Sequence, residues 1–387
     1  MMNIFLFLCI AFLFTFLAGR LIERIRVPWI FAALIFGFLL AIYNPFSFVT
    51  SSSAFTFLAQ LGMYFLLFVI GFELDLNKLK EQGGFILKST LFIIFLEAFF
   101  GTLLVHFVFG YEWLISFVVA LSFATVGEAV LIPILDEFKV VNTKLGQGII
   151  GIGALDDMIE IFVLILVMFL VGSSASVNHL NTALILVSLF ALFGLAFGLT
   201  KLKKSGAKFG FLSIENLFLF VLFVLFLFLG VGEYANATAI AALLSGIALK
   251  TFIPGERLKL IESEVKTMCY GFFAPLFFVW VGVAMDISYL VSYPLLILLV
   301  VAVSNGAKIL GSLIVGRKEL GIKKSVLLGV GLSVRFSTSI IIIKILLENG
   351  LIGIDLYSVI VASSIAFKFI VPVLFSNLLV RWGVSKK

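Results

Sequence analysis

Two adjacent carboxylates, Asp156 and Asp157, lie well inside a long apolar stretch of the chain, roughly residues 147–171. An acidic side chain at the centre of a membrane helix costs at least about 2.5–3.5 kcal/mol, because its charge loses its hydrating water. Bundle interiors and water-filled cavities tolerate such groups, whereas lipid does not. Adjacent buried carboxylates titrate as a coupled pair, so a cation and a proton can compete for them. The pair therefore predicts a functional site.

The overall composition indicates that this pair belongs to a membrane protein. Of the 387 residues, 63% are hydrophobic and only 12% are charged, and that charged fraction is about half of what soluble proteins carry. The first apolar stretch, 3–19, lacks a basic leader and a small-residue cleavage site, so we expect a retained span rather than a signal peptide. Cys9 and Cys269 show no metal-ligand spacing and are interpreted as packing residues.

Thirteen apolar stretches are long enough to cross a bilayer, which takes about 20 residues. We therefore predict an all-α polytopic membrane protein with 13 transmembrane helices. The joint between spans eight and nine is the weakest, because only Val231–Tyr234 separates them, and a single long helix there would give twelve. The approximate limits of the predicted spans are 3–19, 28–46, 57–77, 84–109, 112–135, 147–171, 181–200, 214–231, 233–250, 264–285, 290–315, 324–347 and 353–381.

Lysine and arginine residues outside the spans follow the odd-numbered spans only. The loops after spans two, four, six, eight, ten and twelve contain neither residue type. By the positive-inside rule, this alternation predicts an N-terminus outside the cell and a cytoplasmic C-terminus. The formal charge of +6 is then explained by residues that face anionic lipid at the inner surface, and no nucleic-acid partner is expected.

Basic residues and further acids lie within the spans at a depth similar to that of the aspartates. At about 1.5 Å of rise per residue, the distance from the cytoplasmic end of the span is about 14 Å for Asp156, about 10 Å for Glu128 and Lys308, and about 16 Å for Arg335. Opposite charges from four spans are thus predicted near one level. Snorkelling to the interface is the alternative for the two long basic side chains, but it is closed to a short aspartate.

The other charged residues within the spans have less specific interpretations. Lys344 and Glu348 are one helical turn apart, which predicts a local ion pair. Lys368 and Glu97 are deep and without an evident partner, so a structural and a functional role both stay open. Glu160 lies one turn from both aspartates, where it either lines the same cavity or faces a neighbouring helix.

Two of the predicted spans contain residues that interrupt helices. Span five includes Thr125, Gly127, Glu128 and Pro133, and span twelve has the polar, glycine-rich segment 329–339 around Arg335. Interrupted segments at corresponding positions in two halves are typical of transporters built from inverted repeats. We therefore predict a first repeat at 1–171 (spans one to six), a linker helix at 181–200 and a second repeat at 214–381 (spans eight to thirteen). Glu128 and Arg335 are suited to offset the partial charges of half-helix ends.

Several segments resemble those of a known family. Residues 63–76, MYFLLFVIGFELDL, and 271–282, GFFAPLFFVWVG, are similar to signatures of the monovalent cation–proton antiporters, specifically the bacterial branch of sodium/proton antiporters that is related to the potassium efflux antiporters. Asp156 and Asp157 fall on the paired-acid position of that family, and Lys308 falls on its core lysine. The resemblance covers almost the whole chain.

This resemblance implies roles for individual residues. Asp157 is expected to be the primary ion ligand and proton carrier, Asp156 to pair with Lys308 when no ion is bound, and Thr125 to lie at the break in span five. An Asp-Asp pair with a lysine resembles the electrogenic exchangers of Na⁺ (or Li⁺) for H⁺ in the bacterial inner membrane. The resemblance also implies a homodimer that is no enzyme and needs no cofactor, with Na⁺ and H⁺ as transported ions.

One departure from the family pattern concerns span twelve. The family often has an acid shortly after the arginine, whereas this chain has Arg335-Phe336-Ser337. We hypothesise that Glu128 replaces that acid as the charge partner of Arg335.

Alternating access in this family is expected to move spans four to six and eleven to thirteen against the remaining spans. Three other functions remain open at this point. K⁺ in place of Na⁺ depends on ligand geometry, an ion channel would need a continuous wet path, and a Na⁺-coupled organic-anion carrier would bind its substrate through Arg335.

Overall fold

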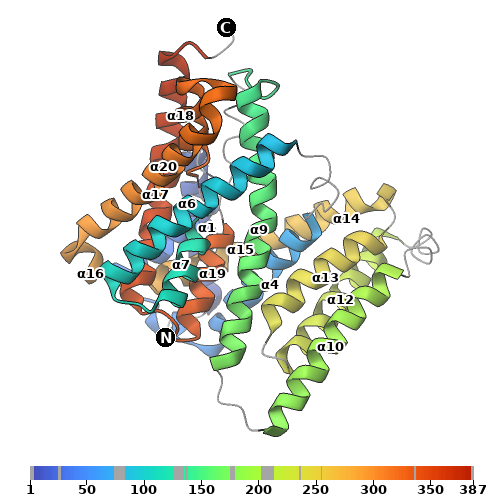
Figure 1. Cartoon of the computed structure of the whole chain (residues 1–387). Helices are drawn as coiled ribbons and strands as arrows, with labels where there is room; N and C mark the ends of the chain where they lie inside the picture. The colour runs from blue at the N-terminus through green and yellow to red at the C-terminus, as the bar shows by residue number, and fades with distance from the viewer. Residues whose placement is uncertain are drawn as a thin grey trace. The chain divides into compact units, whose positions relative to one another are not determined.

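A computed structural model describes the chain over residues 4–24, 28–73, 83–124, 135, 138–174, 179–201, 213–234, 237–253, 255–334 and 337–384 (Figure 1). Within these ranges the secondary structure is helical and contains no strand. Seven of the described helices are long and apolar enough to cross a membrane, and four shorter apolar helices accompany them. The all-α class of the prediction is therefore confirmed, while the count of thirteen spans stays a prediction.

The chain folds as two compact units. Unit 1 comprises Met1–Thr15, Ala33–Leu74 and Met168–Val283, and unit 2 comprises Phe16–Ala32, Asp75–Val167 and Ala284–Lys387. Nearly all of the predicted spans four to six and eleven to thirteen, which we expect to move together, fall in unit 2. Each unit draws on both halves of the chain. The two inverted repeats stay a prediction.

Unit 1 is built around close helix crossings at glycine. A Cβ at Gly71 of α4 would lie 2.2 Å from the carbonyl oxygen of Leu243 in α13, and one at Gly246 of α13 would lie 2.2 Å from the carbonyl oxygen of Phe68. These helices therefore pack backbone against backbone. The described elements of unit 1 are most of α2 (Phe31–Ile42), α3 (Ser47–Thr50), α4 (Ser53–Glu73), α10 (His179–Lys201), α12 (Ile214–Tyr234), α13 (Thr238–Phe252), α14 (Gly255–Met268), the π-helical turn η3 (Cys269–Phe273) and α15 (Ala274–Val283). Helix α1 (Ile4–Glu23) contributes to both units.

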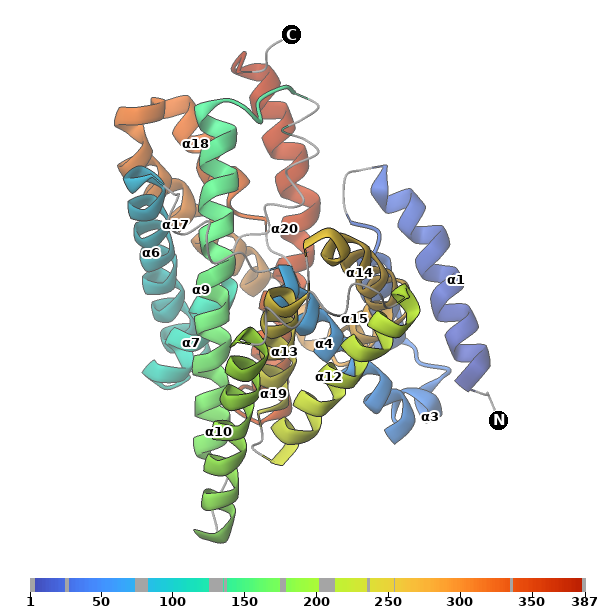
Figure 2. The same ribbon diagram turned by 90° about the vertical axis from the view of Figure 1, so that its right-hand side faces the viewer.

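Unit 2 contains the helices that carry most of the predicted site. Its hydrophobic core joins α9, α18 and α20 through buried side chains such as Ile149, Leu328 and Phe367. Helices α6 and α17 lie side by side in this unit (Figure 2). The described helices are α6 (Gly84–Phe109), α7 (Trp113–Phe123), most of α9 (Lys144–Ser174), α16 (Ile287–Ser292), α17 (Pro294–Leu320), α18 (Ile322–Gly331), α19 (Ser337–Glu348) and α20 (Ile354–Arg381).

Two uncertain points in the predicted spans can be compared with helix boundaries. Helices α12 and α13 are separate, and the N–H of Ala237 between them donates to the carbonyl of Gly232 at 2.8 Å. Span twelve is interrupted, because α18 ends at Gly331 and α19 begins at Ser337. Both predictions are confirmed. In span five, α7 ends at Phe123, and the predicted breaking residues that follow lie outside the described residues.

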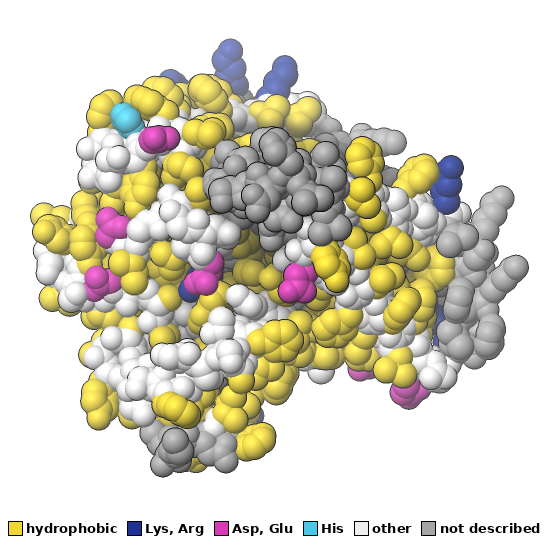
Figure 3. All heavy atoms as spheres, turned by 90° about the horizontal axis from the view of Figure 1, so that it is seen from below, with side chains coloured by type: hydrophobic (Ala, Val, Ile, Leu, Met, Phe, Trp, Pro, Cys, Tyr) yellow, Lys and Arg dark blue, Asp and Glu magenta, His cyan; other side chains and the backbone are white. Residues whose placement is uncertain are grey.

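Large hydrophobic side chains are exposed on helices of both units, for example Phe190 at 79% and Leu295 at 74%. On the face drawn in Figure 3, hydrophobic side chains outnumber charged ones. A soluble protein rarely exposes extended apolar surface of this kind, since water disfavours it. The surface is that of a chain whose helices are solvated by lipid.

Candidate functional site

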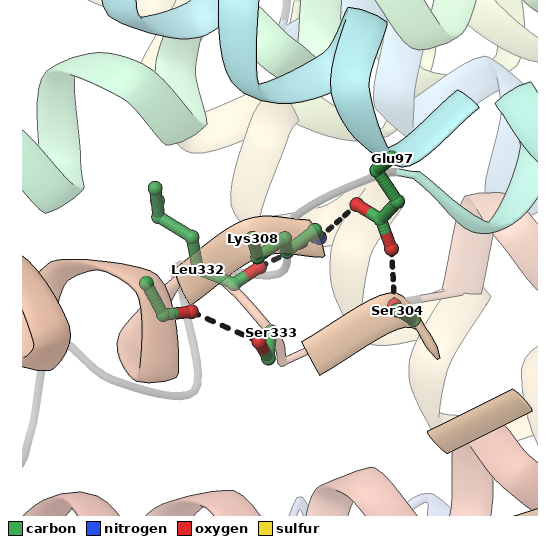
Figure 4. A network of polar contacts seen from close by, with 6 residues as sticks. Glu97, Ser304, Lys308, Leu332 and Ser333 are labelled. Carbon is green, nitrogen blue, oxygen red and sulfur yellow. Dashed lines mark hydrogen bonds and ion pairs between the residues drawn. The ribbon is translucent and has the colours of Figure 1, made fainter. Parts of the chain in front are cut away.

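A buried ion pair joins α17 to α6 within unit 2. The ammonium nitrogen of Lys308 lies 3.2 Å from Oε2 of Glu97, and neither side chain is exposed. The hydroxyl of Ser304, one turn before Lys308 on α17, donates a hydrogen bond to Oε1 of Glu97 (Figure 4). One carboxylate is therefore held through both oxygens by two side chains of the neighbouring helix.

The close approach of α6 and α17 follows from the residues on one face of α17. Ser304, Lys308 and Gly311 are three to four residues apart, so they lie on the same face of the helix. A Cβ at Gly311 would lie 3.2 Å from Cγ1 of Ile93, which is one turn from Glu97 on α6. The small side chain allows the two helices to approach and brings the lysine within reach of the glutamate.

Lys308 also contacts the interruption between α18 and α19. Its ammonium donates a hydrogen bond of 2.7 Å to the carbonyl oxygen of Leu332, the residue that directly follows α18 (Figure 4). Carbonyl groups at a helix C-terminus lack partners within the helix and carry partial negative charge. The lysine therefore neutralises the end of α18 at the point where the span is interrupted.

Glycine also brings the interruption close to Lys308. A Cβ at Gly329 of α18 would lie 2.6 Å from Cα of Ile309 on α17, so the two backbones touch one residue beyond the lysine. The hydroxyl of Ser333, just after α18, donates a hydrogen bond of 2.9 Å to the carbonyl of Gly329 within that helix. This contact fixes the carbonyl of Leu332 beside the ammonium group.

The acidic pair lies on α9 of the same unit. Asp156 is buried, with 1% of its surface exposed. It is one turn from Ile152, which belongs to the core that α9 forms with α18, so the two side chains share a face of the helix. Asp157 follows it on α9. The carboxylate of Asp156 thus lies within the protein rather than in contact with lipid.

Two further lysines are buried in unit 2. Lys344 forms the predicted ion pair with Glu348, one turn later on α19, at 2.8 Å, and its ammonium lies 5.5 Å from the ring centroid of Tyr357 on α20. The ammonium of Lys368 on α20 lies 3.5 Å from the ring centroid of Phe31, a cation–π contact. The local pair is confirmed as predicted.

Comparison with known proteins identifies the family. Residues 10–381 match the family model described as "Sodium/hydrogen exchanger, transmembrane". The chain belongs to this exchanger family. This exchanger is similar to the probable Na⁺/H⁺ antiporter 3 of Methanocaldococcus jannaschii, at 26% identity over 373 residues that cover 94% of each chain. It is also similar to the Na⁺/H⁺ antiporter of Enterococcus hirae, at 27% identity over 378 residues, 95% of this chain and 96% of that one.

A solved structure shares the fold of this exchanger. The sodium proton antiporter MjNhaP1 of Methanocaldococcus jannaschii, at pH 8, aligns over 97% of this chain and 100% of that one with a TM-score of 0.65 and 17% identity. The resemblance inferred from the sequence motifs is thereby confirmed. The chain is a membrane-spanning member of a cation–proton antiporter family, which is a family of transporters rather than enzymes.

The structure of this exchanger describes only part of the predicted site. Asp156 and Lys308 are both buried, on α9 and α17 of unit 2. Thr125, Glu128 and Arg335 lie outside the described residues. The predicted pairings of Asp156 with Lys308 and of Glu128 with Arg335 therefore stay predictions.

Glu97 is the residue that sequence reasoning missed. We expected it to be alone, and this expectation is wrong because it pairs with Lys308. Ser304, its other partner, is 207 residues away in the sequence, so no local spacing relates them. The available signal was depth, because Glu97 lies near the middle of predicted span four, as far from either end as a charge can be.

Proposed function

We propose that this chain exchanges Na⁺ or Li⁺ for H⁺ across the bacterial inner membrane by alternating access. The cation and the proton compete at Asp157 and Asp156. The observation that carries the proposal is the burial of Asp156 within α9, in a unit that also holds a buried lysine against an interrupted helix. Family membership supports the same function.

The chemistry of competition follows from desolvation. A carboxylate away from water is stable only with a compensating cation or proton, so Na⁺ and H⁺ are alternative occupants. In the proposal Asp157 is the primary ligand and proton carrier, and Asp156 pairs with Lys308 when no ion is bound. Arrival of Na⁺ then displaces the lysine from Asp156.

The residues at the two interruptions complete the proposed site. Helices α7 and α18 end at Phe123 and Gly331, shortly before Thr125 and Arg335. Helix ends at these positions support a site in which Thr125 contributes to ion binding. Glu128 is proposed as the charge partner of Arg335, since opposite charges offset one another and the helix-end dipoles.

The exchange is proposed to be electrogenic. Two protons that move against one Na⁺ transfer one net charge, which is worth about 2.3 kcal/mol per 100 mV of membrane potential. The N-terminus is proposed to lie outside and the C-terminus in the cytoplasm, since lysine and arginine follow the odd-numbered spans. Division into two compact units supports a movement in which spans four to six and eleven to thirteen change position together.

A homodimer is part of the proposal by analogy with the family. Exposed hydrophobic side chains are compatible with either lipid or a second copy. Cross-linking in native membranes, followed by mass determination in detergent, tests it. A purely monomeric species in both measurements contradicts it.

Transport by the purified protein in liposomes tests the main proposal. We expect an imposed pH gradient to collapse on addition of Na⁺ or Li⁺, and faster when valinomycin clamps the potential. Asp157→Asn should abolish exchange, whereas Asp355→Asn, at the start of α20, is the matched control that should retain it. Proton flux without any cation would contradict antiport, and exchange with K⁺ alone would favour the K⁺/H⁺ alternative.

The same liposomes separate the remaining alternatives. A channel would carry cations without coupled proton movement. An organic-anion carrier would take up a labelled carboxylate when driven by an imposed Na⁺ gradient. Neither result is expected.

A further inference from the structure

The ion pair between Lys308 and Glu97 adds a further acid, which is buried, to a site described so far through two aspartates. Both of its side chains are inaccessible to solvent, and they come from α17 and α6. A buried cation with more than one acidic partner can change partners only if the acid it leaves becomes neutral, because an isolated buried charge is very costly.

The surroundings of Glu97 suit both a charged and a neutral carboxyl group. Ser304 donates to it here, and the same hydroxyl can accept a hydrogen bond when the carboxyl carries a proton. One turn after Glu97 on α6, a Cβ at Gly101 would meet Ala120 and Phe123 of α7. Lys308 is a charged group in contact with Glu97, and its ammonium also donates a hydrogen bond to the carbonyl of Leu332.

We propose that Glu97 carries the second proton of the exchange cycle, so that Lys308 stays protonated throughout. This inference rests on the proposed Na⁺/H⁺ exchange and deepens it. In the proton-loaded state, Asp157 and Glu97 are protonated and Lys308 pairs with Asp156. In the Na⁺-loaded state, both aspartates hold Na⁺, Glu97 has released its proton, and Lys308 pairs with Glu97 as the structure shows.

The charges balance without any change in the lysine. The proton-loaded state carries zero net charge on these four side chains: two neutral carboxyls, one carboxylate and one ammonium. The Na⁺-loaded state has three carboxylates, one ammonium and one Na⁺, which gives a net charge of minus one. Two protons are released for each Na⁺ bound, as electrogenic exchange requires.

The rival assignment lets Lys308 give up the second proton when Na⁺ displaces it from Asp156. The two assignments make opposite predictions for arginine at this position, because a guanidinium group stays protonated in proteins. They also differ for Glu97→Gln, which keeps the shape of the side chain and removes its ability to release a proton.

Proton release on Na⁺ binding to the purified protein in detergent, and the reversal potential of exchange in liposomes, test the proposal. For the unmodified chain we expect two protons per Na⁺. Glu97→Gln should release one proton per Na⁺ and exchange without net charge movement. Lys308→Arg should still release two, even if its turnover falls. Glu348→Gln, in the lysine–glutamate pair whose acid is 41% exposed, is the matched control and should release two.

The outcomes distinguish the assignment of the second proton from the proposed exchange itself. Two protons per Na⁺ from Glu97→Gln, or one from Lys308→Arg, would overturn the assignment of the second proton to Glu97. If Glu97→Gln does not fold, the result with Lys308→Arg decides. A lack of Na⁺-coupled proton movement in the unmodified chain would instead contradict the proposed exchange itself.

Discussion

The two lysine–glutamate pairs of unit 2 use the same residue types in opposite settings. Lys308 and Glu97 join two helices, and neither side chain is exposed. Lys344 and Glu348 are one turn apart on a single helix, and the side chain of Glu348 is 41% exposed. In the first pair each charge is stabilised by the other, because neither side chain reaches solvent. In the second pair the carboxylate is also stabilised by its polar surroundings, because it is partly exposed. The depth of the acid, rather than the pairing, decides how much the protein depends on the ion pair.

The largest expected difference between the pairs is the loss of stability when the lysine is removed. Lys308→Met keeps the aliphatic stem but leaves Glu97 buried without this cation, which typically costs about 3–5 kcal/mol. Lys344→Met should cost about 1 kcal/mol or less, because a partly exposed carboxylate is stabilised by solvent. Urea unfolding of the two variants in detergent measures the difference. Equal losses would contradict the comparison.

Removal of both charges from the buried pair should recover much of that loss. A well-packed apolar pair in place of a buried ion pair is often neutral or stabilising. We therefore expect the double variant Lys308→Met with Glu97→Leu to be more stable to unfolding than Lys308→Met alone by about 2 kcal/mol or more. Transport should be abolished in both variants. A double-mutant cycle by the same unfolding assay gives the coupling energy. Additive losses would show that the two side chains do not depend on each other.

A smaller effect is expected from the hydroxyl group that supports Glu97. Hydrogen bonds to charged groups contribute about 1.5–3 kcal/mol, so Ser304→Ala should destabilise the protein within that range. Ser363→Ala is the control, because Ser363 is also buried but donates within its own helix to the carbonyl of Ile360. Similar unfolding midpoints for the two variants would argue that Ser304 adds little to the buried pair.

The smallest effect is expected at the acid of the local pair. Glu348→Gln keeps a carbonyl oxygen that can accept a hydrogen bond from the buried ammonium of Lys344, and the charge it removes is 41% exposed, so we expect a loss of about 1 kcal/mol. Unfolding and the initial rate of exchange should both stay close to those of the unmodified chain. A loss of exchange comparable to that in Asp157→Asn would assign Glu348 a part in ion passage.

The sequence predicted the features that depend on local spacing. The ion pair of Lys344 with Glu348, the interruption after Gly331 and the separation of α12 from α13 all follow from residues within a few turns of each other. The all-helical membrane class followed from composition, and the family from motifs. These signals do not require knowledge of which helices are neighbours.

The partner of Lys308 could not be predicted in the same way. Its contact with Glu97 depends on the close approach of α17 to α6, which Gly311 allows. A glycine does not by itself predict such an approach, because many glycines in the chain have no such role. The estimated depths placed Lys308 near the level of Asp156, and the resemblance to the family predicted that Asp156 is its partner. That pairing, the pairing of Glu128 with Arg335 and the inverted repeats stay predictions.

The reciprocal glycines of unit 1 limit how this part of the sequence can vary. A side chain at Gly71 meets the backbone of α13, and one at Gly246 meets the backbone of α4; Gly37 of α2 and Gly282 of α15 form a second such crossing. Because each obstacle is main chain, a second substitution cannot make room for the first. In a library that randomises all four positions, tolerated variants should retain glycine at each of them, and pairs of substitutions should fail as completely as single ones.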